Sequence, residues 1–412
     1  MKKASIYIFL FFYLYFVFPK SFLNDYIISF FMLCFIVLMD MNAFSKSVKM
    51  LKYKTISFFM IGVLLSSIYY LIIYLFFLQD AFSFENTRIV QNLRSIIIVI
   101  QAVAITGILN KCGIDFDKSK VIIFRLAAFQ GIICLIMLVF PSLKSFANQL
   151  FVTNTRYEDG SYILLVRIFG LTSDYTYGMP IVHGIISSLC FYYALSENIR
   201  YFIYMPFILS AAVLNSRTGI LIAIIGIIIV AFYSIYVYKR ISLKKMVLSI
   251  LIFLIICLIL CFNEHVAQFM SILFTEIFNF FSSNQLTGTS EYLLNSHLFF
   301  PNGVGLLFGE GHRVFGSEGL QYGYVSSDIG YVNDMFMGGL IYCLILYWSY
   351  FRIILYNTNQ DKKITNIIIA ISWCIANLKG QATVNYQINA FIILWFVFSN
   401  YLKRNCSHET NQ

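Results

Sequence analysis

The chain has 412 residues, of which 60% are hydrophobic and only 12% charged, and its formal net charge is +10. This composition excludes a soluble globular domain, because apolar segments long enough to cross about 30 Å of hydrocarbon recur along the whole chain. Such segments must satisfy their own backbone hydrogen bonds, and runs such as 220–232 lack the alternation typical of barrel strands. We therefore predict an all-α, polytopic integral membrane protein.

About twelve transmembrane helices are predicted from the apolar runs and the polar connections between them. In chain order they lie near residues 4–18, 24–41, 56–78, 89–109, 121–140, 178–196, 201–215, 218–238, 246–262, 331–353, 364–379 and 387–402. The first run, MKKASIYIFLFFYLYFVF, looks like the start of a signal peptide. It has no small-residue cleavage site and another run follows at once, so we interpret it as a retained helix.

The basic residues predict the orientation of these helices, because cytoplasmic connections are enriched in Lys and Arg. The clusters fall at the chain ends and in every second connection: Lys2, Lys3, Lys46, Lys49, Lys52, Lys54, Lys111, Lys118, Lys120, Arg200, Lys239, Arg240, Lys244, Lys245, Arg352, Lys362, Lys363, Lys403 and Arg404. The exceptions in the other short connections are single residues: Lys20, Arg88, Arg217 and Lys379. Both termini are thus predicted to be cytoplasmic. Basic residues dispersed in this way do not form a groove for nucleic acid.

Two connections on the outer face are long, near residues 141–177 and 263–330. The second begins with HVAQFMSILFTEIFNFF, which is apolar enough to lie on the membrane surface or to re-enter it. None of the nine Cys falls in either loop, so we expect neither disulfides nor a Cys-based metal site. No internal repeat or linker divides the chain, which predicts one membrane domain over residues 1–412.

Arg217 lies in LNSRTGILIAIIGIIIV, between two predicted spans that only a very short turn can join. This places a guanidinium at the outer membrane boundary, directly before a helix N-terminus. Both features suit an anion such as a lipid-linked pyrophosphate. An interfacial anchor that reaches the headgroups is an equal alternative from the residues alone.

Two further arginines lie near the predicted outer face. Arg167 belongs to RIFGLTSDYTYGMP, where glycines permit a close approach of backbone to ligand, and Asp174 either joins the site or simply pairs with Arg167. Arg94 lies about one to two turns inside the fourth predicted span. An intramembrane arginine faces a polar cavity, pairs with an acceptor or reaches the surface, so a functional role is one of three alternatives.

The most Gly-dense stretch of the chain covers residues 306–340 and leads into the tenth predicted span. His312 and Arg313 follow a Gly-x-Gly there, and a solvated loop tip is the alternative to a functional role for both. Asp328 and Asp334 flank the start of the span, and on one straight helix they would point roughly 120° apart. Asp328 can act as a base at the mouth of the span, whereas Asp334 can cap or orient.

At these residues the chain resembles the O-antigen polymerase (Wzy) and O-antigen ligase superfamily of bacterial envelope glycosyltransferases. LNSRTGILI is similar to the Ser-Arg-small-Gly signature of that family, and RIFGLTSDYTYG to its Arg-x-x-Gly segment. LLFGEG followed by SDIGYVNDMFMGGLIY is similar to its closing pattern of a Gly-x-Gly turn before a Gly-Leu in the next span. The three segments occur in the family's order, and the resemblance is clearest over residues 167–344.

The resemblance implies a GT-C-like fold in the bacterial inner membrane and transfer of a glycan from undecaprenyl pyrophosphate to an acceptor hydroxyl, without a cofactor or metal. Arg217 and Arg167 would then hold the pyrophosphate or substrate. Asp328 stands where the ligases and many polymerases have a His, so either Asp328 or His312 would be the base. The early arginine of the family's second large loop is missing from TGTSEYLLNSH, and Arg313 is the candidate substitute.

Three functions are compatible with these residues. A polymerase of lipid-linked repeat units in lipopolysaccharide or related polysaccharide biosynthesis is preferred, because the family's His is missing at position 328. A ligase that transfers finished polymer to lipid A–core is the first alternative, and a flippase for the same lipid-linked unit is the second. Two large outer loops and the lack of an inverted repeat disfavour a transporter. Membrane lipid and a chain-length regulator are the implied partners.

Overall fold

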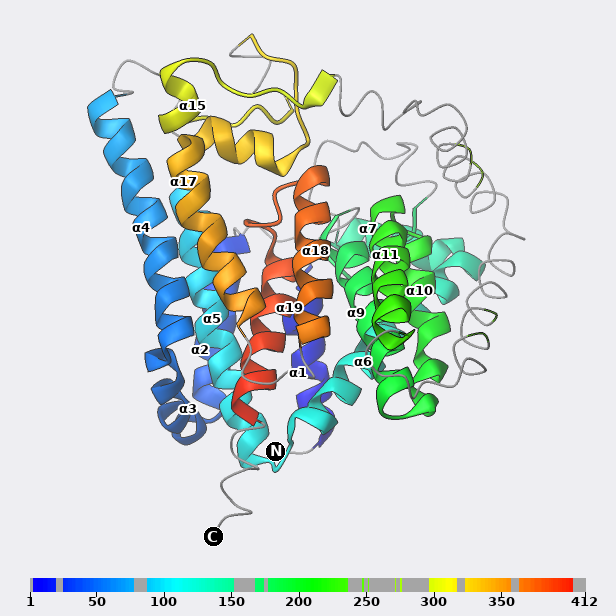
Figure 1. Ribbon diagram of the computed structural model, residues 1–412. Helices are drawn as coiled ribbons and strands as arrows, with labels where there is room; N and C mark the ends of the chain where they lie inside the picture. The colour runs from blue at the N-terminus through cyan, green and yellow to red at the C-terminus, as the bar shows by residue number, and fades with distance from the viewer. Residues whose placement is uncertain are drawn as a thin grey trace. The chain divides into compact units, whose positions relative to one another are not determined.

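The computed structural model describes residues 3–19, 25–77, 87–151, 167–173, 177–235, 296–316, 323–356 and 363–402, with residues 247, 251, 271 and 275 between them. Every regular element in these segments is a helix, and none of them forms a strand (Figure 1). Five helices in this part of the chain are long and apolar enough to cross a membrane, and a sixth crossing results if one bent pair is a single span. The all-α prediction is therefore confirmed, and the helices are those of a membrane protein.

Several predicted spans correspond to helices that are apolar but shorter than a full crossing. These shorter helices are Ile6–Tyr15, Ile199–Val213, Arg217–Tyr233 and Tyr386–Leu402. The predicted span 246–262 and the apolar start of the second long loop lie outside the described residues, apart from single positions. The first long loop begins with a helix, α7 (Pro141–Phe151).

The chain forms two compact units, and the first contains Met1–Phe22, Asp117–Gln285 and Asn359–Ser372. Its described helices are α1 (Lys3–Tyr15), α6 (Phe116–Val139), α7, α9 (Gly178–Ser196), η2 (Ile199–Tyr204), α10 (Met205–Val213), α11 (Arg217–Tyr233) and the start of α18 (Lys363–Lys379). Helix α9 is buried on every side from Gly178 to Leu195. A helix that is apolar all round belongs in the interior of a bundle, which explains the central position of α9 in this unit.

Glycines let α9 and α11 pack with their backbones in contact. A Cβ on Gly184 would lie 2.4 Å from the carbonyl oxygen of Gly219, and a Cβ on Gly219 would lie 2.5 Å from that of Pro180. Further along α11, a Cβ on Gly226 would lie 2.0 Å from the hydroxyl of Ser188. Small residues at such a spacing allow close helix packing in a membrane, where no hydrophobic force drives helices together.

The second unit contains Leu23–Phe116, Leu286–Thr358 and Trp373–Gln412. Its described elements are α2 (Asp25–Met39), α3 (Met41–Ser47), η1 (Val48–Lys52), α4 (Lys54–Phe77), α5 (Thr87–Lys111), α15 (Val304–Phe308), α17 (Gly330–Leu355), the end of α18 (Lys363–Lys379), α19 (Tyr386–Val397) and η5 (Phe398–Leu402). Helix α5 packs against α2, α3, α4 and α19, and α17 runs along α4. This packing surrounds α5 with helices of its own unit and places its polar side chains in the interior.

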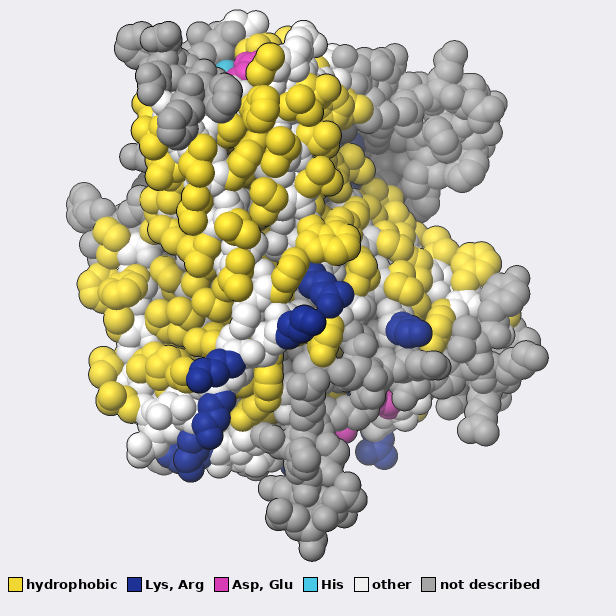
Figure 2. Space-filling model, turned by 60° about the vertical axis from the view of Figure 1, so that its left-hand side comes forward, with side chains coloured by type: hydrophobic (Ala, Val, Ile, Leu, Met, Phe, Trp, Pro, Cys, Tyr) yellow, Lys and Arg dark blue, Asp and Glu magenta, His cyan; other side chains and the backbone are white. Residues whose placement is uncertain are grey.

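One face of the second unit is broadly apolar (Figure 2). Large hydrophobic side chains of α2, α4 and α17 are exposed on the unit: Ile27, Phe30, Phe31, Phe35, Leu38, Phe58, Ile61, Leu64, Leu65, Ile68, Leu71, Ile72, Leu75, Leu340, Leu344 and Trp348. Soluble monomers rarely expose apolar patches of more than a few hundred Å², so this surface fits contact with lipid.

Candidate functional site

Helix α17 is interrupted at Gly339, whose φ of 67° and ψ of −170° are not helical. A Cβ here would stand 2.3 Å from the carbonyl oxygen of Leu307, so only glycine lets α15 lie this close. The break frees the carbonyl of Phe336, which accepts hydrogen bonds from the amides of Glu310 at 2.6 Å and Gly311 at 3.1 Å. Figure 1 shows the part of α17 before the break turning away from the longer part, below α15.

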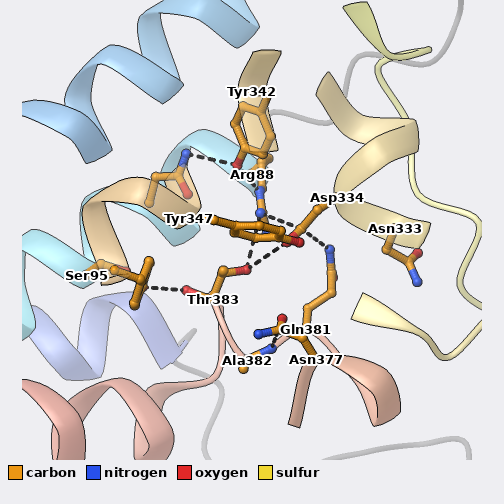
Figure 3. Close-up of polar contacts among 12 residues, drawn as sticks. Arg88, Ser95, Asn333, Asp334, Tyr342, Tyr347, Asn377, Gln381, Ala382 and Thr383 are labelled. Atoms are coloured by element: carbon orange, nitrogen blue, oxygen red, sulfur yellow. Dashed lines mark hydrogen bonds and ion pairs between the residues drawn. The ribbon is translucent and has the colours of Figure 1, made fainter. Parts of the chain in front are cut away.

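Asp334 lies on the part of α17 before the break and is fully buried against Arg88 of α5. The Nη2 atom of Arg88 is 2.6 Å from Oδ1 of Asp334, and both side chains are 0% exposed. Oδ1 also accepts a hydrogen bond from Gln381 at 2.9 Å, while Oδ2 accepts from Tyr347 at 2.8 Å and from Thr383 at 3.3 Å (Figure 3). Arg88 therefore neutralises a carboxylate that three further side chains help to hold, one from α17 itself and two from the connection between α18 and α19.

These contacts determine what the buried pair can do. A carboxylate has four lone-pair positions, and four donors occupy those of Asp334, so this group cannot also take a proton from a substrate. The Nε atom of Arg88 donates to the hydroxyl of Tyr342 at 2.5 Å, but its buried Nη1 has no partner among the described residues. The pair thus orients the first part of α17. Among the described residues, the Nη1 group of Arg88 remains without an acceptor.

The sequence identified only half of this arrangement. The sequence predicts an orienting role for Asp334 but marks Arg88 only as an exception among the charges of the short loops. The two residues are 246 positions apart, and each lies beside a polar connection, where a charge is unremarkable. The sequence does show two opposite charges at the ends of two apolar runs, which is a weak sign of an ion pair. Only the structure shows that the two side chains are buried and in contact.

His312 is buried in a small cluster of aromatic and acidic side chains, not solvated at a loop tip. Its Nδ1 lies 3.1 Å from the carbonyl oxygen of Glu310, and its Nε2 lies 3.8 Å from Oε2 of the same residue. The Tyr324 hydroxyl donates to Oε2 of Glu310 at 3.0 Å, and the Tyr324 ring packs on Phe336. Partial burial and the Glu310 carboxylate raise the pKa of the Tyr324 phenol. Sequence reasoning missed Glu310 because it resembles an ordinary loop residue.

Arg313 and Asp328 lie on two chain segments that hydrogen bonds hold together. The Ser327 amide donates to the carbonyl of Val314 at 2.7 Å, joining the residue before Asp328 to the residue after Arg313. Asp328 precedes the first turn of α17, so it does not share one straight helix with Asp334 as the predicted geometry assumed. Its side chain is 48% exposed, and Oδ2 lies 3.7 Å from Nζ of Lys379. Of the two predicted bases, Asp328 is thus the accessible one.

Arg94 has partners within the second unit. Its Nη2 donates to the carbonyl oxygen of Val384 at 2.6 Å, and its guanidinium lies 5.0 Å from the ring centroid of Tyr26 and 5.8 Å from that of Tyr386. Two aromatic faces and a carbonyl are favourable partners for a cation at an apolar position. Among the three sequence-based alternatives, pairing inside the protein is the one that these contacts support.

The segments that carry Arg167 and Arg217 lie against each other in the first unit. The amide of Ile168 donates to the carbonyl oxygen of Leu214 at 3.0 Å, so the RIFG segment lies against the turn before α11. Arg217 is the first residue of α11, after an extended N-cap at Ser216. Both arginines are partly exposed. Asp174, the third residue predicted here, lies outside the described residues.

Several hydrogen bonds hold the segment after Arg167 in place. The Gln130 side chain donates to the carbonyl of Leu171 at 3.1 Å, and the hydroxyl of Thr172 donates to the carbonyl of Tyr15 at 3.0 Å. Gly170 has a φ of 67°, and a Cβ there would lie 2.6 Å from the Gln130 amide nitrogen. Glycine is therefore required for this turn, as the predicted close approach of backbone implies.

No group of three or more His, Cys, Asp or Glu in the described part of the chain could hold a metal ion. The chain matches no protein-family model, no curated protein and no solved structure. Two separate groups of candidate residues remain, each within its own unit: Arg167 and Arg217 in the first unit, and the residues around the break of α17 in the second.

Proposed function

We propose that this protein is a membrane glycosyltransferase that polymerises oligosaccharide repeat units carried on a polyprenyl pyrophosphate, like the O-antigen polymerases its motifs resemble. The observation that carries the proposal is the hydrogen bond from Ile168 to the Leu214 carbonyl at 3.0 Å. It brings together two segments whose motifs were matched independently in the sequence, each with one arginine. If the chain belongs to the family it resembles, these two segments must lie close together. Composition alone does not predict that they do.

The two arginines suit the departing pyrophosphate. In the proposed reaction, a hydroxyl oxygen of one repeat unit forms a bond to the anomeric carbon of another. The bond from that carbon to the pyrophosphate oxygen breaks, the electron pair leaves with polyprenyl pyrophosphate, and the hydroxyl proton passes to a base. Arg167, Arg217 and the first amides of α11 stabilise the negative charge that develops on the leaving group.

Asp328 is the proposed base, with Arg313 as an additional substrate contact. Asp328 has the exposure that a substrate contact requires, whereas Asp334 is enclosed by four donors. His312 is buried beside Glu310, and we assign it to supporting the loop. Asp328→Asn is expected to abolish polymer formation while the protein level stays normal, and wild-type polymer in this variant would remove the assignment.

The proposed setting is a bacterial inner membrane, with about twelve spans in one membrane domain, two periplasmic loops and both termini in the cytoplasm. Deletion followed by gel analysis of surface polysaccharide distinguishes the alternatives. Loss of a polymerase leaves acceptors with a single repeat unit. Loss of a ligase leaves bare acceptor with lipid-linked polymer, and loss of a flippase leaves bare acceptor without outward-facing repeat units.

Arg217→Ala tests the pyrophosphate role directly. We expect loss of the polymer ladder at unchanged protein level, with Arg217→Lys retaining only part of it because an ammonium cannot bind a phosphate in two places at once. Arg352→Ala is the matched control, since Arg352 is an exposed arginine on α17 that has no role in the proposal. A full ladder from Arg217→Ala would contradict the proposal.

A further inference from the structure

A second basic site lies in the first unit, at the end where α6 begins. Arg125 of α6 is exposed nine residues after Phe116, about 14 Å along the helix. Its neighbours on the helix are exposed hydrophobic residues: Phe129 is 51% exposed and Ile136 is 41% exposed. An arginine on a lipid-facing surface is costly unless it has an anionic or polar partner. Neutral partners can fix the guanidinium of Arg125 in these apolar surroundings, but only an anion would neutralise its charge.

Two tyrosines hold the Arg125 guanidinium in place. Its Nε donates to the Tyr204 hydroxyl at 3.2 Å, and its Nη1 donates to the Tyr7 hydroxyl at 3.0 Å. Among the residues that the structure describes, Nη2 donates to no acceptor. A guanidinium fixed on one side by neutral hydroxyls retains its full charge and presents its remaining donors to a ligand.

The guanidinium faces a cavity of about 530 Å³. The described residues that line the cavity are Arg125, a second arginine (Arg200), Asn198, two tyrosines and three aliphatic side chains, and none of them is acidic. Asn198 fixes the start of the Arg200 segment, because its side-chain oxygen accepts a hydrogen bond from the Arg200 amide at 3.0 Å. Two cations, polar donors and an aliphatic wall together fit a ligand that is anionic at one end and apolar at the other.

The nearby carboxylates form ion pairs with Lys120 and not with these arginines. Asp117 lies 2.8 Å from Nζ of Lys120, and Glu197 pairs with the same ammonium, whose side chain is fully buried. Lys120 also lies 4.4 Å from the ring centroid of Tyr193, which fixes its position. Among the described residues, neither carboxylate forms an ion pair with Arg125 or Arg200, so both guanidinium groups can pair with an anion from outside the protein.

We propose that this cavity binds the phosphate headgroup of an anionic membrane lipid, with an acyl chain along the exposed apolar surface of α6 and η2. Ile203 of η2 is 67% exposed beside the cavity, which supports a lipid over a soluble anion. The charge pattern predicts that this end of α6 faces the cytoplasm, so the lipid would come from the inner leaflet. The site is distinct from the proposed pyrophosphate site, and neither proposal depends on the other.

The test is native mass spectrometry of the full-length protein, purified in neutral detergent and titrated with phosphatidylglycerol, with phosphatidylcholine or with inorganic phosphate. We expect phosphatidylglycerol adducts that phosphatidylcholine does not match and phosphate does not displace. Arg125→Gln with Arg200→Gln should weaken phosphatidylglycerol binding about tenfold or more, because charge-assisted hydrogen bonds are lost. Arg352→Gln should leave the binding unchanged.

A milder variant guards against a folding defect. Tyr204→Phe removes one hydroxyl that positions Arg125 but leaves the charge, and we expect binding to weaken by about two- to fivefold. Equal binding of phosphatidylglycerol by the wild type and the double variant would overturn the proposal. Equal binding of phosphatidylcholine would also overturn it, as would displacement of the lipid by inorganic phosphate.

Discussion

The buried pair of Arg88 and Asp334 leads to an asymmetric prediction about stability. Both side chains are fully buried and only 2.6 Å apart, and removing one partner of such a pair typically costs about 3–5 kcal/mol. The costs of the two single changes should differ, because a stranded carboxyl group can take up a proton, whereas an arginine stays charged in proteins. Asp334→Leu should therefore destabilise the protein by the upper end of that range, and Arg88→Met by the lower end.

The partners that remain in each variant support the same order. Without Arg88, Asp334 keeps its hydrogen bonds to Gln381, Tyr347 and Thr383. Without Asp334, Arg88 keeps the Tyr342 hydroxyl and a long contact of 3.4 Å to Thr383. The double variant removes both charges, and replacing a buried pair by apolar residues is often neutral or stabilising. We therefore expect the double variant to be more stable than Asp334→Leu alone.

The assay is thermal unfolding of the four proteins (wild type, two single variants and the double variant) in one neutral detergent at one pH. The double-mutant cycle gives the coupling energy, which should be at least about 2 kcal/mol for two groups in direct contact. Additive losses, with a coupling close to zero, would refute the reasoning that the two charges compensate each other. A greater loss from Arg88→Met than from Asp334→Leu would refute the argument about protonation.

Two further predictions concern the backbone of the loop and the pH. Gly339→Ala should cost about 1–3 kcal/mol in thermal unfolding, because φ is 67° and the new Cβ would meet the Leu307 carbonyl. Gly323→Ala is its control, because Gly323 has a φ of 77° but no atom of a described residue within 4 Å of the Cβ, so this variant should show the cost of backbone strain alone. Burial lowers the pKa of Lys144 on α7 to about 8 from 10.5, so the unfolded chain binds more protons between these values. Stability should consequently rise as the pH increases from about 8 to 10.5, and Lys144→Met should remove this rise when unfolding is compared at both ends of the range.

The helices were predictable from the sequence because hydrocarbon permits no other backbone arrangement for long apolar runs. The turn before α11 was predictable because only a few residues separate two apolar runs there. The break at Gly339 was not, because glycine also occurs within unbroken membrane helices. Only the approach of the Leu307 carbonyl distinguishes this glycine, and that contact depends on another helix, α15, which lies earlier in the chain.

Among the charged residues, too, the sequence predicts some contacts and not others. Arg167 and Arg217 were predicted together from the order of motifs, and a hydrogen bond between their segments joins them in the first unit. Arg88 could not be recognised, because its partner lies on a distant part of the chain. Arg94 was treated as a candidate for substrate binding, yet its contacts with Tyr26, Tyr386 and Val384 lie within the helix packing of the second unit. Partners distant in sequence determine whether an intramembrane arginine is structural, and a single sequence does not contain them.

The first part of α17 connects the buried pair to the loop that carries Asp328. Asp334 anchors this part through its ion pair with Arg88. Two residues later, the carbonyl of Phe336 accepts hydrogen bonds from the amides of Glu310 and Gly311. A change at Arg88 thus loosens the same short helix that holds the loop, although Arg88 contacts neither His312 nor Asp328. Arg88→Met should therefore lower the proposed polymer formation even at a temperature where the variant is fully folded. A less stable variant with full polymer formation would show that the loop and the buried pair are not coupled.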